Sequence, residues 1–137
     1  MSKLTDQQLA HTLARLGLGI NIALHGLTRI PKFGAFAAHL QEQFAPTFLP
    51  AGLVSLSAYG IVAAEATLGL LLLAGYRLRL TLAGGCALMG VLLFGTCLVQ
   101  NWTVAGDQLI YLGFFAGLLA TRRYSAWTIG EKQPGGV

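Results

Sequence analysis

The stretch Gly60-Ile-Val-Ala-Ala-Glu-Ala-Thr-Leu-Gly-Leu-Leu-Leu-Leu-Ala-Gly75 decides the fold. Glu65 is its only charged residue, and the apolar run around it extends from residue 52 to residue 76. A helix needs about 20 mainly apolar residues to cross roughly 30 Å of hydrocarbon. We therefore expect this stretch to form a membrane-spanning helix that carries one embedded carboxylate.

The composition of the whole chain also indicates a membrane protein. Of its 137 residues, 55% are hydrophobic and 10% are charged, whereas a soluble domain carries about 25% charged residues. These values favour a single membrane domain, and they exclude a second domain and a basic nucleic-acid surface. The net charge of +4 is explained by basic residues that flank membrane spans.

Charges and prolines divide the chain into four apolar segments. The fold class that they predict is an all-α membrane protein, a bundle of four transmembrane helices with spans at about 9–30, 52–76, 80–100 and 104–121. Residues 32–45 lie between two prolines and repeat Phe and Leu at helical spacing. They predict an amphipathic interfacial helix that covers one end of the bundle, either as a plain cover or as a gate. Residues 122–137 form the predicted C-terminal tail.

The basic residues predict the orientation. With four spans, one side of the membrane holds most of them, namely Lys3, Arg77, Arg79, Arg122, Arg123 and Lys132, and the other side holds Arg29 and Lys32. The positive-inside rule then places both termini in the cytoplasm and the protein in the inner (plasma) membrane. The N-terminal segment lacks the pattern of a cleaved signal peptide.

Two charged residues stand out deep inside predicted spans, Arg15 and Glu65. A charge near the centre of a span costs about 2.5–3.5 kcal/mol, so it usually faces a partner in the bundle interior. Measured from the predicted cytoplasmic ends of their spans, the two residues lie at depths of roughly 9 and 16 Å. We therefore predict an Arg15–Glu65 ion pair, which either has a structural role or takes part in proton or ligand binding.

The first span carries a polar stripe along its length. On a helical projection it comprises His11, Arg15, Ile22, His25 and Arg29, with Asn21 at its margin. We expect the stripe to line the bundle interior and Gly26 to leave space beside the His25 ring. That ring could hydrogen-bond a carbonyl, pass a proton or bind a metal, or could serve as a simple interhelical hydrogen bonder.

Other motifs are less specific. No cluster has zinc spacing, no haem ligand pair or nucleotide motif is evident, and His11 and His25 would lie about 21 Å apart on one helix. Gln100, Asn101 and Asp107 should lie near His25 and the interfacial helix, where they predict either a polar pocket or helix caps. The Gly113–Gly117 GxxxG motif predicts close helix packing, within the bundle or between copies.

Two segments carry a family resemblance. Ala14–Arg29, followed by a Phe-rich amphipathic loop, and Ala64–Gly75, followed by a short Arg-containing turn, resemble the DoxX family over about residues 10–121. Many members of that family have Lys at the position of Arg29. The resemblance implies a small four-helix inner-membrane protein beside a redox or sulfur-handling partner. Its name-giving relatives include a membrane subunit of a thiosulfate:quinone oxidoreductase.

The function that we predict is a DoxX-like membrane subunit of a redox or sulfur-oxidising system that interacts with quinone. It would be the membrane subunit of a quinone-linked oxidoreductase, with a redox partner protein or a second copy of the chain beside it in the bilayer. The alternatives are a small proton-coupled transporter that uses Glu65 and a purely structural anchor or assembly subunit. The predicted binding residues are His25, Arg29, Arg15, Glu65, Asn21 and Gln100.

Overall fold

The computed structural model of the chain describes residues 3–131. Within that range the chain is helical, and its elements follow in the order α1 (Asp6–Arg29), η1 (Ile30–Lys32), α2 (Phe33–Phe44), α3 (Ala51–Ala74), α4 (Leu78–Leu98), α5 (Trp102–Ala120) and η2 (Arg122–Tyr124). The predicted all-helical architecture is confirmed. Lys132 and the rest of the predicted tail beyond residue 131 lie outside the described residues.

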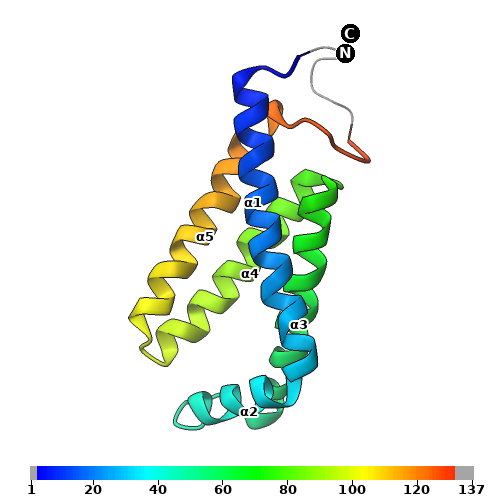
Figure 1. The fold of residues 1–137 in the computed structure, drawn as a ribbon. Coiled ribbons are helices and arrows are strands. Elements are labelled where there is room, and N and C mark those ends of the chain that lie inside the picture. The colour runs from blue at the N-terminus through cyan, green and yellow to red at the C-terminus, as the bar shows by residue number, and fades with distance from the viewer. Residues whose placement is uncertain (1–2, 132–137) are drawn as a thin grey trace.

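The four long helices form a bundle of two helix pairs. α1 packs mainly against α3 and α4 packs mainly against α5, while the short helix α2 runs across the end of the bundle where α1 finishes (Figure 1). The start of α1 and the end of α5 lie together at the opposite end. The predicted helix at 32–45 therefore exists and covers one end of the bundle, and its position at a membrane surface stays a prediction.

Local sequence signals explain where α1 begins and where α3 ends. Thr5 and Gln8 form a reciprocal capping box that starts α1. Gly75 ends α3 in a left-handed conformation with φ of 67°. Its N–H donates to the Leu72 carbonyl, and the next N–H donates to the Leu71 carbonyl. This is a Schellman motif, which favours glycine because its backbone angles are costly for residues with a Cβ.

Small residues bring α1 and α3 into backbone contact. A Cβ added to Gly69 would lie 2.2 Å from the Ala23 nitrogen, and one added to Gly26 would lie 2.3 Å from the Ala66 nitrogen. In membranes, close approach of this kind supplies packing that apolar side chains alone do not. The predicted space beside His25 is therefore wrong, because the backbone of α3 occupies the position next to Gly26.

These contacts set the antiparallel register of the pair. Residues that lie level have numbers that add up to 91 or 92: Gly19 with Leu72, Ala23 with Gly69, and Gly26 with Ala66. In this register α3 ends level with Leu18, so the first three turns of α1 extend beyond it. The first half of α3 extends beyond the other end of α1 and packs against α2.

The second helix pair has its own close contact. Gly85 of α4 faces Phe115 of α5, whose ring would lie 2.1 Å from an added Cβ. Both helices contribute to one apolar core, which also contains Leu72 of α3 and Ile22 of α1. Phe115 is completely buried, and the core therefore joins the two pairs into one bundle.

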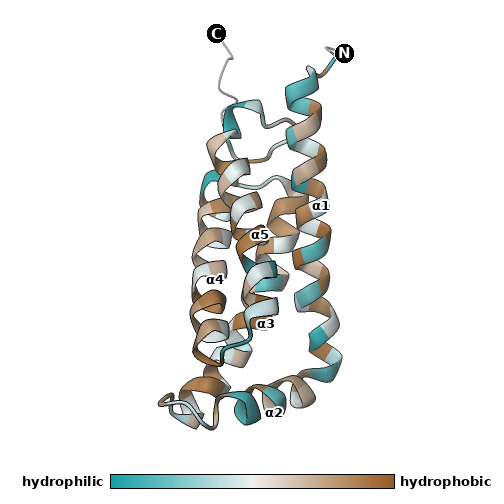
Figure 2. Ribbon diagram, turned by 90° about the vertical axis from the view of Figure 1, so that its left-hand side faces the viewer, coloured by the Kyte–Doolittle hydropathy of each residue, from teal (hydrophilic) through white to brown (hydrophobic). Residues whose placement is uncertain are grey.

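Three of the helices, α3, α4 and α5, are long and apolar enough to cross a membrane. α1 has 24 residues but does not belong to this group, and Figure 2 shows hydrophilic positions recurring along its length. A membrane location is supported by the three apolar helices. The first span, predicted at 9–30, stays a prediction.

The GxxxG motif of α5 does not contribute to the bundle interior. Gly113 and Gly117 are exposed, and a Cβ added to either would meet nothing within 4 Å. Of the two interpretations of the motif, packing within the bundle is therefore wrong. Self-association through this face stays a prediction.

Candidate functional site

A cavity of about 650 Å³ lies between the helices at the end of the bundle that α2 covers. Its walls are mainly apolar and include Phe36, Phe44, Ile61, Met89 and Leu92, and all five α-helices contribute polar side chains. Ligand cavities in proteins typically measure about 300–1,000 Å³ and combine apolar walls with a few polar groups. The cavity has the dimensions and lining of a site for a small, largely apolar molecule.

Three of the six predicted binding residues line this cavity. His25 and Arg29 reach it from α1, and Glu65 reaches it from α3. In the register of the two helices Glu65 lies level with Leu27, midway between the two α1 residues. The close packing of α1 on α3 therefore brings the three polar side chains together.

Arg29 and Glu65 form an ion pair in the cavity wall. Nη1 of Arg29 donates to the Glu65 carboxylate. The Glu65 side chain is 5% exposed and the Arg29 side chain is 31% exposed, so the carboxylate is the enclosed partner and the guanidinium borders open space. An enclosed carboxylate needs such a partner, because an uncompensated charge in the bundle is costly.

The predicted Arg15–Glu65 ion pair is wrong. Arg15 lies level with residue 77 of the chain, which is twelve residues from Glu65 and therefore about 18 Å along the helix axis. The prediction assumed that the first and second spans end at the same depth. Instead α1 extends three turns beyond α3, and Arg29 takes the place that was predicted for Arg15.

Arg15 is bound at the opposite end of the bundle. It is 1% exposed, and its guanidinium donates to the carbonyls of Leu72 at 2.8 Å and of Ala126 and Trp127 at 3.3 Å each. Leu72 belongs to the last turn of α3, where backbone carbonyls carry the negative end of the helix dipole. Arg15 is thus a structural cation that ties the C-terminal tail to α1 and α3.

His25 is held in one orientation. Its Nδ1 lies 2.8 Å from the Asn21 carbonyl, and its ring meets the edge of Tyr111, with the ring centroids 6.2 Å apart. A carbonyl can only accept, so Nδ1 carries the proton. In the neutral ring Nε2 is then an acceptor.

The other two predicted residues do not line the cavity. Gln100 is exposed in the turn before α5, with φ of 57°. The side-chain oxygen of Asn21 is buried without a hydrogen-bond partner in the described part of the chain. Asn101 and Asp107 do line the cavity, as predicted. Asn101 also caps α5 through the Val104 N–H, so the pocket and the cap interpretations both hold for it.

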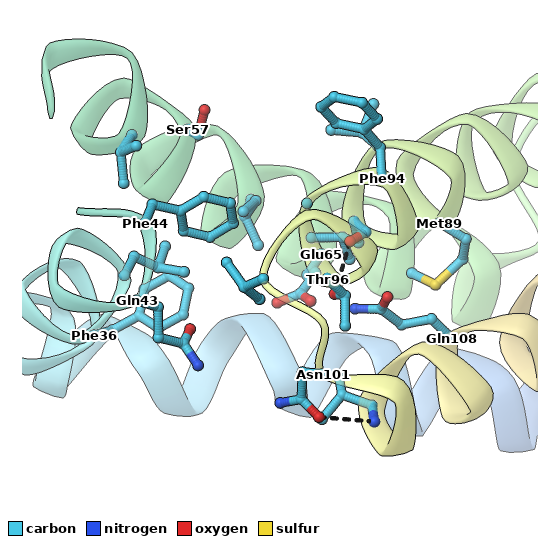
Figure 3. Close-up of a pocket in the computed structure, with 18 of the residues that line it drawn as sticks. Phe36, Gln43, Phe44, Ser57, Glu65, Met89, Phe94, Thr96, Asn101 and Gln108 are labelled. Carbon is cyan, nitrogen blue, oxygen red and sulfur yellow. Dashed lines mark hydrogen bonds between the residues drawn. The ribbon is translucent and has the colours of Figure 1, made fainter. Parts of the chain in front are cut away.

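Gln108 is one of the cavity residues that the sequence did not point to. It lies on α5, its Oε1 is buried without a partner among residues 3–131, and its side chain points toward the same space as Glu65 (Figure 3). The signal in the sequence was a polar residue one turn before Tyr111 in an apolar helix.

Side-chain contacts fasten α2 across the cavity. Phe36 lies under the Arg29 guanidinium, 4.6 Å from its central carbon to the ring centroid, and Phe33 packs on Tyr59 of α3. Gln41 donates to Ser55 near the start of α3. Since Arg29 contacts both Glu65 and Phe36, the ion pair and the covering helix share one side chain.

A comparison with protein families gives a match over most of the chain. The model of a family described as "methylamine utilisation protein MauE" matches residues 7–109 of the 137. The matched region runs from α1 into α5 and contains His25, Arg29, Glu65 and Gln108. No curated protein and no solved structure matches the chain.

Proposed function

The chain belongs to the MauE family of membrane proteins, and on this basis we propose that it is a membrane subunit of a redox system whose cavity binds a quinone. The family description refers to methylamine utilisation, in which oxidation of the amine requires an electron acceptor. The resemblance to the DoxX family supports the same proposal, because it implies a four-helix membrane subunit beside a redox partner.

The cavity is the observation that carries the proposal. A quinone has an apolar ring and tail and two carbonyl oxygens, so its site needs apolar walls and a few hydrogen-bonding groups. The cavity walls are mainly apolar, and the hydrogen-bonding groups come from Arg29, His25 and Gln108. Arg29 uses one N–H on Glu65, and its remaining N–H groups are donors suited to a ligand carbonyl.

Another protein would supply the electrons that reduce the bound quinone. The sequence has no recognisable motif for a redox cofactor, so the chain would bind and orient the quinone while another protein delivers electrons. A redox partner protein is therefore part of the proposal.

The proposed orientation places the bundle end opposite α2 in the cytoplasm. Arg77 and Arg79 precede and begin α4, and the Arg79 N–H and the Arg122 guanidinium both bond to Glu131. These contacts gather basic residues at one end, which supports cytoplasmic termini in an inner membrane. A transporter or a purely structural subunit stays an alternative prediction, which no contact in the cavity favours.

Quinone retention tests the proposal. We would purify the protein in mild detergent, extract it with solvent and quantify quinones, and then titrate a decyl-substituted benzoquinone into quinone-free protein. Ile61→Trp should abolish binding because Ile61 lines the cavity. Leu70 lies on the same helix and is 50% exposed, so the control variant Leu70→Trp should bind quinone as the wild type does. Wild-type protein that neither retains nor binds quinone would refute the proposal.

A further inference from the structure

The ring of His25 lines the cavity and is held in one orientation. The Asn21 carbonyl keeps the proton on Nδ1, and the contact with Tyr111 limits rotation of the ring. No donor in residues 3–131 bonds to Nε2, and the residue lines the cavity. The site therefore presents a fixed hydrogen-bond acceptor to its ligand.

The neighbouring cation completes the polar end of the cavity. Arg29 lies one helical turn after His25 on α1, and both residues flank the level of Glu65. The free guanidinium N–H groups of Arg29 donate, whereas Nε2 of His25 accepts. A ligand oxygen that reaches both residues forms two hydrogen bonds only if it can accept and donate together.

We propose that His25 makes the cavity selective for the reduced carrier, because a quinol hydroxyl can accept from Arg29 and donate to Nε2 of His25. A quinone carbonyl can only accept, so it satisfies Arg29 and leaves Nε2 without a donor. This inference rests on the proposed quinone site. It adds that the bound form is preferentially the quinol, the product that forms when the quinone takes up two protons and the two electrons that the partner delivers.

The size of the preference follows from one hydrogen bond. A single neutral hydrogen bond changes an affinity by roughly 2- to 10-fold. We therefore expect wild-type protein to bind the quinol that much more tightly than the matching quinone. His25→Phe keeps a ring against Tyr111 but removes the acceptor, and it should bind the two forms equally.

The experiment compares decyl-benzoquinone with its quinol under anaerobic conditions, on quinone-free protein in lipid nanodiscs. Thr28→Val is the matched control, because Thr28 is exposed on the same helix and its hydroxyl donates to the Leu24 carbonyl. The Thr28→Val variant should still bind the quinol more tightly than the quinone. Glu65→Gln tests whether the carboxylate, and not His25, accepts the hydroxyl proton.

The outcomes separate the two proposals. Failure of wild-type protein to bind either form refutes the quinone site itself. If wild-type protein binds both forms equally, the quinone site stands and the selectivity is refuted. If the preference for the quinol survives in His25→Phe and disappears in Glu65→Gln, Glu65 causes the preference and the assignment to His25 is refuted. Nitrogen-15 NMR of labelled histidine gives an independent measurement: the His25 signals should show a protonated Nδ1 and a bare Nε2, and the opposite tautomer would overturn the inference.

Discussion

The C-terminal tail should detach when Arg15 loses its guanidinium. Arg15→Met keeps an unbranched apolar side chain of similar length and removes the three donors that reach Leu72, Ala126 and Trp127. The Leu72 carbonyl still accepts from the Gly75 N–H. The carbonyls of Ala126 and Trp127 lose this bond, so the damage should concentrate in the tail.

The magnitude follows from those contacts. Hydrogen bonds that involve a charged group contribute about 1.5–3 kcal/mol each, and the two tail bonds are long at 3.3 Å. We therefore expect a loss of about 2–4 kcal/mol in the stability of the docked tail. A loss of 2 kcal/mol raises the population of the detached tail by about 30-fold.

Trypsin cleavage after Arg122 and Arg123 measures this population, because proteolysis of a briefly opened segment follows its equilibrium occupancy. Arg15→Lys keeps the charge but lacks the planar fork that reaches several carbonyls, so its cleavage rate should be intermediate. Gly75→Ala should act like Arg15→Met, since its Cβ would lie 2.3 Å from Nη1 of Arg15.

Gly17→Ala is the matched control, because a Cβ at that exposed position meets nothing within 4 Å. It should leave cleavage unchanged and should not lower the unfolding temperature, because alanine favours a helix more than glycine does. If trypsin cleaves the Arg15→Met variant at the wild-type rate, Arg15 does not hold the tail and the reasoning is wrong. A double-mutant cycle that couples Arg15 to Glu65 would refute it as well, because the register separates these two residues by twelve positions.

Three further predictions concern the cavity and the helix pairs. A double-mutant cycle on Arg29 and Glu65, using Gln at each position and thermal unfolding in detergent, should give a coupling of about 0.5–3 kcal/mol; additive effects would contradict the ion pair. Gly69→Ala should destabilise the protein by about 1–3 kcal/mol because its Cβ meets the backbone of α1, whereas Gly117→Ala should not lower the unfolding temperature. Phe36→Ala removes a cation–π contact of about 0.5–1 kcal/mol and should speed amide hydrogen exchange in α2, and unchanged exchange would show that Arg29 does not hold this helix.

Individual residues show where sequence reasoning succeeds. The prolines at 31 and 50 and the apolar spacing between them predicted a helix at 32–45, and α2 occupies Phe33–Phe44. This worked because helix formation there depends on local periodicity. The last span was predicted from residue 104, but α5 begins at Trp102 because Asn101 caps it.

The partner of Glu65 shows where that reasoning fails. The sequence identified the two buried charges and the polar stripe, because any charge in an apolar helix stands out by its cost. It could not identify which cation meets Glu65, since depth was counted from helix ends that turned out to be offset by three turns. The offset depends on the contacts of Gly26 and Gly69 with the opposite helix.

The sequence by itself therefore determined the helices, their apolar character and the residues that must face the interior. Each of these follows from local periodicity and from the cost of placing polar groups in lipid. Only the tertiary structure decided that Arg29 pairs with Glu65 and that Gln108 lines the same cavity. Pairing across helices depends on register, and register is set by the close packing of small residues, whose fit is a property of two surfaces together.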